Sequence, residues 1–320
     1  MAYFHQPVLV KEVLEYLNLK PNDNVIDCTV GGGGHAVKIL EKTKPKGRLL
    51  GLDRDPEAIL AAGQNLKKFS NRITLIQDSY KNTKKIIDEQ RFNLQFNGLL
   101  LDLGLSSAQI AAENHRGFSF KSEQTLDMRF GPDTEITAAE ILNKWSKEDL
   151  IRIFKEYGEE KFAKSIAEKI ILFRARKLLT ATSDLVNIIE SSYPASFARG
   201  TGRGRSRIHP ATKVFQALRI AVNDELKVIK EALPKLLSAL EPGGRMVVIS
   251  YHSLEDRLVK QFFQQEAKGC LCPKEFPVCR CGHQPSIKIL TKKPVQAQPP
   301  EIMENPRSRS AKLRVAEKNK

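Results

Sequence analysis

The sequence has no apolar run long enough to cross a lipid bilayer, and its first residues, with Lys11, Glu12 and Glu15, lack the apolar core of a signal peptide. We therefore expect a cytoplasmic protein with no membrane partner. Cysteines are also scarce, with five among 320 residues. In a reducing compartment, thiols are expected to be reduced or metal-bound rather than paired in disulfides.

Acidic residues are in deficit. The chain has 37 Asp and Glu residues against 52 Lys and Arg residues, which gives a net charge of +15. Such a field attracts polyanions, with nucleic acid first among them, although a basic protein with a merely solvated surface is the alternative. The length fits about two domains and allows a sizeable core.

The most informative stretch is 24–35, where an apolar strand ending in Asp27 runs into four glycines at 31–34. A helical apolar stripe follows directly, so the pattern predicts a strand, a tight turn and a helix start. The helix N-terminus adds a partial positive charge. Asp53 ends the next apolar run, at the spacing of the ribose-binding acid in nucleotide sites. Together these features predict a ligand that carries adenosine.

Strands alternate with helices along the rest of the chain, which predicts a doubly wound α/β sheet. Further strands are expected at 47–53, 72–77, 98–102, 246–250, 287–290 and 313–316. The carboxyl ends of parallel strands meet at the edge where ligands bind. Four strand-end acids are therefore expected at that edge: Asp27, Asp53, Asp78 and Asp102. For Asp78, bonding to loop amides is an equal alternative.

The 103–245 segment separates the fourth and fifth strands and far exceeds the dozen residues that a helical crossover needs. Its apolar residues recur at helical spacing, so we expect an inserted helical domain over 119–208, with 1–118 and 209–320 forming the sheet domain. The stripe at 214–221 is expected to return to the sheet domain. Pro234 interrupts the next stripe, which predicts a kink or two short helices.

Two polar segments follow strands at the ligand edge. Asp102 begins a polar loop that ends at Gln109, where methyltransferases acting on exocyclic amines carry a polar motif; this loop lacks the Pro-Pro-aromatic form of that motif. His252 follows the fifth strand and is therefore expected at the active site. No role is assigned to it, since a lone histidine is often a packing element. His209 and Asn223 are treated in the same way.

A Gly-rich loop at the domain junction carries guanidinium groups that suit contact with RNA phosphates. These residues are Arg199, Arg203, Arg205 and Arg207. A solvated linker is the alternative. The basic segment 288–320 could add phosphate contacts. Three aromatic residues flank Arg116 and Arg129, and they could stack an extruded base or pack in the core of the inserted domain: Phe118, Phe120 and Phe130.

Four thiols lie within twelve residues, at Cys270, Cys272, Cys279 and Cys281. This density favours a tetrahedral zinc site, although the Cys-x-Cys spacing is tighter than usual. Cys28 lies in the first strand and is expected to pack in the core.

The chain closely resembles the bacterial 16S ribosomal RNA cytosine-N4 methyltransferase family, of the RsmH or MraW type. Motifs that carry the resemblance run in order from residue 5 to about 317 and include the glycine loop, Arg116-Gly-Phe-Ser-Phe, Leu126-Asp-Met-Arg, His209-Pro-Ala-Thr-Lys, His252-Ser-Leu-Glu-Asp-Arg and Asn305-Pro-Arg-Ser-Arg. The resemblance implies a Rossmann-like class I fold and methyl transfer from S-adenosylmethionine to N4 of a decoding-site cytidine in the small subunit.

By the same resemblance, 1–118 and 209–320 form the methyltransferase domain, and 119–208 recognises the substrate. The implied cofactor contacts are Gly33, Gly34, His35, Asp53, Tyr80, Asp102 and Gln109. Many relatives have phenylalanine in place of Tyr80, which fits a stacking role. The cysteine cluster occurs in only part of the family and is not essential to the reaction. Asp102 is the candidate catalytic residue, with His252 as a weaker one.

Two other classes compete with this interpretation. The glycine pattern alone also fits an NAD-dependent oxidoreductase, against which the basic surface and the Pro-Gly-Gly turn before the fifth strand argue. A ribosome-assembly factor that binds RNA without catalysis is the second alternative. The intact glycine loop and Asp53 argue against it.

Overall fold

The computed structural model describes residues 7–89, 94–105, 116–120, 122–193, 209–273, 276, 278 and 280–320. The chain divides into two compact units. We call Met1–Gly104 with Leu226–Lys320 the sheet unit and Leu105–Glu225 the helical unit.

The sheet unit is built on a seven-stranded sheet in the order β3-β2-β1-β4-β5-β7-β6. The strands are β1 Val25–Asp27, β2 Leu49–Asp53, β3 Ile73–Gln77, β4 Phe96–Asp102, β5 Leu240–Ser250, β6 Ile287–Ile289 and β7 Lys312–Lys318. Strands β1 to β5 are parallel, and β7 is antiparallel to both of its neighbours. The strand order reverses beside β1, which is where ligands bind in open α/β sheets. The predicted doubly wound fold is confirmed.

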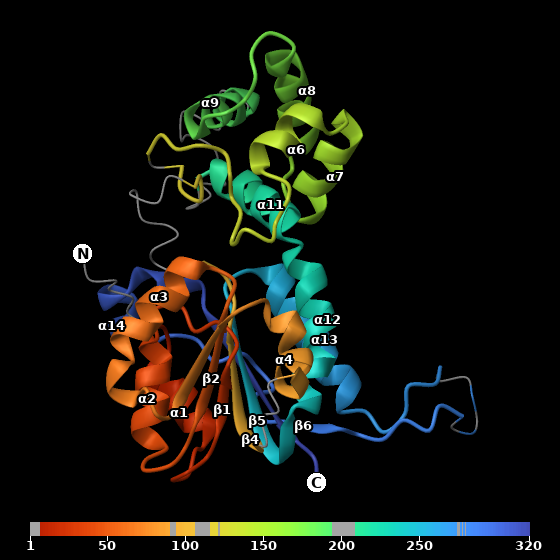
Figure 1. The fold of residues 1–320 in the computed structure, drawn as a ribbon. Coiled ribbons are helices and arrows are strands. Elements are labelled where there is room, and N and C mark those ends of the chain that lie inside the picture. Colours follow the sequence, from red (N-terminus) through yellow and green to blue (C-terminus); the bar gives the residue numbers. More distant parts are fainter. Residues whose placement is uncertain are drawn as a thin grey trace. The chain divides into compact units, whose positions relative to one another are not determined.

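Helices cover both faces of the sheet (Figure 1). One face is covered by α1 Val10–Leu17, α2 Gly34–Lys42 and α3 Pro56–Asn65, and the other by α4 Thr83–Glu89, α12 Glu225–Ser238 and α13 Ser253–Glu266. Successive residues of β4 alternate between the two cores, with Leu100 in the first and Leu99 and Leu101 in the second. Because both faces are buried there, the central strands β1, β2 and β4 are mostly apolar rather than alternating with polar residues.

Short elements complete the sheet unit. They are the 3-10 helices η1 Lys67–Phe69, η2 Tyr80–Asn82 and η4 Pro306–Ser310, and the helix α14 Pro299–Glu304. No helix of the described residues is long and apolar enough to span a membrane.

Two local predictions in the sheet unit are corrected. Strand β5 begins at Leu240 rather than 246, because Leu240 pairs with Phe96 and the expected turn at 241–244 is a bulge inside the strand. The stripe around Pro234 forms one helix, α12, rather than two short ones. Its leucines, including Leu233 and Leu236, are buried against the sheet, and this burial outweighs the hydrogen bond that proline removes.

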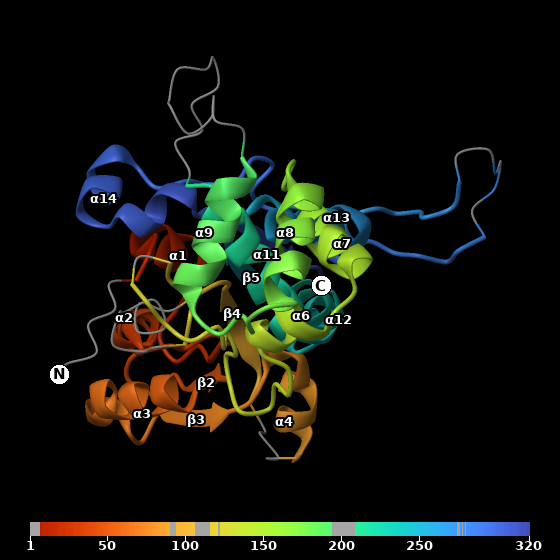
Figure 2. The same cartoon turned by 90° about the horizontal axis from the view of Figure 1, so that it is seen from above.

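The helical unit packs five described helices around one apolar core. These are α6 Ala138–Lys144, α7 Lys147–Glu156, α8 Ala163–Arg174, α9 Thr182–Ser192 and α11 Ala211–Asn223 (Figure 2). The start of α6 is fixed by a capping box between Thr137 and Glu140.

Helix α11 was expected to return to the sheet domain, and this is wrong. Its buried residues Val214, Phe215 and Leu218 lie in the same core as those of α7 and α8. A helical stripe says only that one face is buried, not which core buries it. The helical unit therefore extends beyond the 119–208 range expected from the sequence.

Candidate active site

Strands β1 and β4 bring two of the predicted acids to the carboxyl edge of the sheet. The two strands are parallel neighbours, and their register pairs Asp27 with Leu100. Thr29 joins the two strand ends, because its backbone N–H donates to Asp27 Oδ1 at 3.3 Å and its hydroxyl accepts from the Asp102 N–H at 2.7 Å. Asp27 is 1% exposed, so its carboxylate is held inside the edge rather than in solvent.

Asp53 holds the glycine loop. Its Oδ2 accepts from the Gly31 N–H at 2.9 Å, and its Oδ1 accepts from the Asp55 N–H at 3.0 Å. Gly33 has a φ of 83° and precedes α2, where an added Cβ would lie 2.9 Å from Leu66 Cδ1. The loop therefore needs glycine for both its conformation and its packing. Gly34 and His35 form the first turn of α2.

Burial makes these carboxyl groups weak acids. It is the main cause that raises the pKa of Asp27 to about 7, with the Thr29 N–H opposing it and the charges of Asp102 and Asp53 adding to it. It raises the pKa of Asp102 to about 7 and that of Asp53 to about 6, the latter against the N–H groups of Asp55 and Gly31. The second oxygen of Asp27 is buried with no hydrogen-bond partner among the described residues. Such an edge stabilises a bound cation or a ligand rich in hydrogen-bond donors.

Tyr251 is part of this site and was missed in the sequence. Its hydroxyl donates to Asp102 Oδ1 at 2.9 Å, while His35 Nε2 lies 3.8 Å from Asp102 Oδ2. Burial and the charge of Asp102 raise the pKa of Tyr251 well above its ordinary value, so the hydroxyl stays a donor. Gly104, with a φ of 100°, leaves space for the ring, since a Cβ there would be 3.1 Å from Tyr251 Cδ2. The sequence contained a signal for Tyr251, because this residue directly follows a strand, as the strand-end acids do.

His252 caps a helix. It is the N-cap residue of α13, and its Nδ1 accepts from the Glu255 N–H at 3.5 Å. The Glu255 carboxylate in turn accepts from the Tyr251 N–H at 2.8 Å. This capping box supports the packing interpretation of His252 and also fixes the backbone of Tyr251.

Asp78 and Tyr80 lie beyond the third strand. Asp78 Oδ1 accepts from the Ser79 N–H at 2.6 Å and from Asn82 Nδ2 at 2.7 Å, so it bonds to its own loop. Tyr80 is half-buried and packs beside the core that contains Ile86. Its stacking role stays a prediction.

Several predicted site residues fall outside the described residues. They are Gln109, Arg199, Arg203, Arg205, Arg207 and Cys279.

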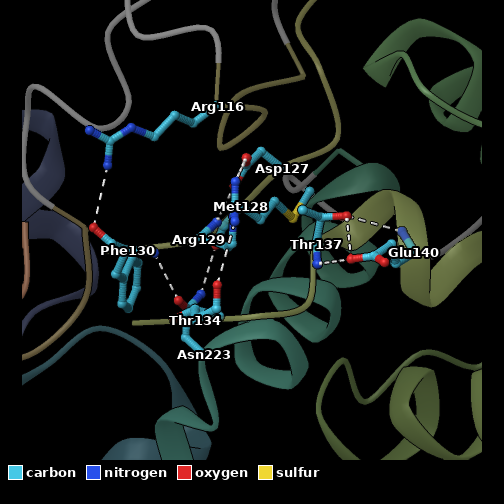
Figure 3. A network of polar contacts seen from close by, with 9 residues as sticks. All are labelled: Arg116, Asp127, Met128, Arg129, Phe130, Thr134, Thr137, Glu140 and Asn223. Atoms are coloured by element: carbon cyan, nitrogen blue, oxygen red, sulfur yellow. Dashed lines mark hydrogen bonds and ion pairs between the residues drawn. The ribbon is translucent and has the colours of Figure 1, made fainter. Parts of the chain in front are cut away.

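In the helical unit, Asn223 anchors an irregular segment between 116 and 137 (Figure 3). Its Oδ1 accepts from the Phe130 N–H at 2.9 Å, and its Nδ2 donates to the Met128 carbonyl at 2.8 Å. Asn223 is 3% exposed and Met128 has a φ of 61°. The side chain therefore replaces the backbone partners that a helix or strand would supply.

The other candidate side chains of the helical unit also contact neighbouring side chains. Arg129 Nε and Nη2 donate to the two oxygens of Asp127 at 2.9 and 2.7 Å (Figure 3). Phe118 and Phe130 stack on each other with ring centroids 5.7 Å apart. Phe120 stacks on His209 at 4.8 Å, and His209 Nε2 lies 3.2 Å from Glu190 Oε1. These contacts favour a packing role for the three phenylalanines.

We expect Asn223→Ala to lower the free energy of unfolding by about 1–3 kcal/mol, because it leaves the part-buried Phe130 N–H and the buried Met128 carbonyl without their side-chain partner. Urea denaturation followed by circular dichroism measures the change. Asn319→Ala is the matched control, since its Nδ2 makes one exposed bond to Pro285. Equal midpoints for the two variants would contradict the anchoring role of Asn223.

The family model described as the MraW methylase family matches residues 2–319. The chain is 48% identical to the protein named ribosomal RNA small subunit methyltransferase H of Heliobacterium mobile, over 99% of this chain and 100% of that protein. It is 48% identical to the protein of the same name from Heliobacterium modesticaldum, over 99% of both chains. It is 45% identical to that of Symbiobacterium thermophilum, over 99% of this chain and 98% of the relative.

Proposed function

The chain belongs to the MraW methylase family, and from that premise we propose that it methylates N4 of a decoding-site cytidine in small-subunit (16S) ribosomal RNA. Family membership makes it an S-adenosylmethionine-dependent methyltransferase with a Rossmann-like class I fold. The observation that carries the finer proposal is Asp102, a strand-end residue beside the glycine loop whose carboxylate accepts from the Tyr251 hydroxyl and whose backbone N–H donates to the Thr29 hydroxyl.

The residues at the sheet edge fit S-adenosylmethionine. At Gly31 an added Cβ would meet no atom closer than 4.0 Å, so the loop leaves open space there. The oxygens of Asp53 accept the Gly31 and Asp55 N–H groups and keep lone-pair capacity for ribose hydroxyls. When bound, the cofactor supplies a methyl group that its sulfonium charge has already activated. We propose that it is held by Gly33, Gly34, His35, Asp53, Tyr80, Asp102 and Gln109.

Asp102 is the proposed acceptor for the cytidine amine. The lone pair of N4 is delocalised into the ring, so the amine is a poor nucleophile. A carboxylate that accepts an amine N–H fixes the nitrogen and stabilises the positive charge that develops on it. Tyr251 positions this carboxylate by occupying one lone pair of Oδ1.

RNA is the proposed partner, bound as part of the small subunit in the cytoplasm. The net charge of +15 supplies long-range attraction. Arg199, Arg203, Arg205 and Arg207 are proposed to contact phosphates, with the helical unit holding the RNA around the extruded base. Not every cation of 288–320 takes part, because Arg314 is buried and donates to Asp256 Oδ1 at 2.6 Å.

Incubation with methyl-labelled cofactor and unmodified small subunits, followed by nucleoside analysis, tests the proposal. Label is expected in N4-methylcytidine at one site. Naked 16S ribosomal RNA, assayed in parallel, distinguishes the assembled subunit from free RNA as substrate. Label in another nucleoside, or in protein, would contradict the proposal.

We expect replacing Arg203, Arg205 and Arg207 by alanine to flatten the salt dependence of RNA binding by about two to three units of log–log slope, because each lost phosphate contact removes roughly 0.7–0.9 units. The measurement is RNA affinity at a series of salt concentrations. A triple alanine variant of Lys38, Lys84 and Lys85 is the control, because these lysines lie 3.5–3.8 Å from carboxylates of their own helices. If both triple variants keep the wild-type slope, the arginine loop does not contact phosphates.

A further inference from the structure

Three cysteines converge in a segment that the proposed methyl transfer does not use. The segment is 268–286, which we call the cysteine loop; it connects α13 to β6 and runs out from the sheet in both views (Figures 1 and 2). The Sγ atoms of Cys270, Cys272 and Cys281 all lie within 4.8 Å of one another. None of the three is in a disulfide.

Their spacing matches a metal site. The Sγ atoms of Cys270 and Cys281 are 3.8 Å apart. Two thiolates at tetrahedral positions around zinc, each at a Zn–S distance of about 2.3 Å, would be separated by about 3.8 Å. This separation is much longer than a disulfide bond of about 2.05 Å.

Each of the three sulfurs also accepts a backbone N–H. The Leu271 N–H donates to Cys281 Sγ at 3.3 Å, the Cys272 N–H to Cys270 Sγ at 3.4 Å, and the Arg280 N–H to Cys272 Sγ at 3.3 Å. A neutral thiol is a weak acceptor, whereas a thiolate gains a charge-assisted bond. Such donors are the outer-shell contacts that orient metal ligands.

Burial does not hold the cysteine loop together. Its described residues form no helix or strand, and none of them is buried. The apolar side chains of Leu271, Phe276 and Val278 are 41%, 47% and 68% exposed. The base of the loop is closed by the Ser286 N–H, which donates to the Glu266 carbonyl at 2.8 Å. Ordering the rest costs conformational entropy that these exposed residues do not offset.

We propose that Cys270, Cys272 and Cys281 bind a structural zinc ion that folds the cysteine loop. A cluster of thiolates selects a soft ion, and zinc tolerates tetrahedral sulfur without redox change. A structural site takes a fourth ligand, for which Cys279 is the sequence candidate. The ion stands outside the proposed reaction, and it stabilises the loop as zinc stabilises small domains that lack a core.

Metal analysis of the full chain, purified without chelators, tests the proposal by measuring zinc, iron and copper together. About one zinc per chain is expected. Cys272→Ser and Cys281→Ser are expected to lose it, while Cys28→Ala, the control for a cysteine outside the loop, keeps it. Circular dichroism checks that the variants fold.

Two further measurements do not depend on methyl transfer. Chelation should expose the loop thiols to a thiol reagent and open 268–286 to limited proteolysis, and both changes should reverse when zinc is restored. Replacing zinc by cobalt should give the absorption of tetrahedral cobalt thiolate. The proposal is overturned if zinc-treated wild-type protein holds no zinc and its loop thiols react freely, if the bound metal is iron or copper, or if Cys270 and Cys281 are isolated as a disulfide.

Discussion

Asp102→Asn is expected to lower the single-turnover rate of methyl transfer by roughly 100- to 1,000-fold while nearly preserving cofactor affinity. This range is typical for the loss of one preorganised group that stabilises developing charge. Asparagine keeps the shape of the side chain and an oxygen that can accept the Tyr251 hydroxyl, which now donates at 2.9 Å. It removes the negative charge, and its NH₂ group cannot accept the amine N–H.

The pH dependence of this rate follows from the same group. Burial raises the pKa of Asp102 to about 7. The ionised carboxylate has both oxygens free of protons and can accept the amine N–H, whereas the protonated form is a weaker acceptor. The wild-type rate should therefore rise with pH through about 7 and then level off. The Asp102→Asn variant should lack this rise. Because Asp27 also titrates near 7, a rise that persists in the variant would assign the pH dependence to Asp27.

The raised pKa has the opposite effect on stability. The unfolded chain releases the Asp102 proton near pH 4, whereas the folded protein keeps it until about pH 7. The contribution of this group to the free energy of unfolding therefore falls as pH rises between these values. Rate profiles should accordingly be recorded with circular dichroism at each pH, so that loss of fold is not mistaken for loss of chemistry.

Tyr251→Phe separates positioning from chemistry. It removes the hydroxyl that holds Asp102 Oδ1 but leaves the carboxylate, so the rate of methyl transfer is expected to fall by about tenfold, in line with the loss of one charge-assisted hydrogen bond.

If cofactor affinity falls in step with the rate in Asp102→Asn, then Asp102 is a cofactor ligand. The amine acceptor would then have to be sought among the backbone carbonyls of 103–109 or at His252.

Strand positions could be predicted from the sequence because each central strand is buried on both faces. Leu99, Leu100 and Leu101 alternate between two cores, so the whole run must be apolar and stands out as a block. The partner of a helix is not encoded in the same way. The stripe of α11 predicts a helix equally well in either core, and only the structure shows Val214 and Leu218 among the residues of α7 and α8.

The site was predictable to the extent that chain position determines it. Asp27, Asp53 and Asp102 end apolar strands, and parallel strands end at one edge. What each acid does there was not predictable, since Asp78 satisfies the same rule yet its carboxylate accepts from Ser79 and Asn82 of its own loop. The raised pKa values depend on burial and on neighbouring charges, which sequence position does not give.

Asp53→Ala is expected to weaken the binding of S-adenosylmethionine by about ten- to over a hundredfold, because removal of a charged hydrogen-bond acceptor typically costs roughly 1.5–3 kcal/mol. Two effects combine in this variant. The acceptor for ribose hydroxyls is lost, and the Gly31 N–H loses the partner that now lies at 2.9 Å. Asp53→Asn separates them, since it keeps an oxygen for Gly31 but not the charge.

Isothermal titration calorimetry at pH 8 is the measurement, because burial raises the pKa of Asp53 to about 6 and the carboxylate must be ionised in the wild type. Asp78→Ala is the matched control, a strand-end carboxylate that also accepts a backbone N–H. Its affinity should stay closer to that of the wild type, because the Asp78 carboxylate bonds to Ser79 and Asn82 of its own loop rather than to the glycine loop. Unchanged affinity in a folded Asp53→Ala protein would remove Asp53 from the cofactor site. Equal losses in the Asp53 and Asp78 variants would instead assign the effect to general loosening of the sheet edge.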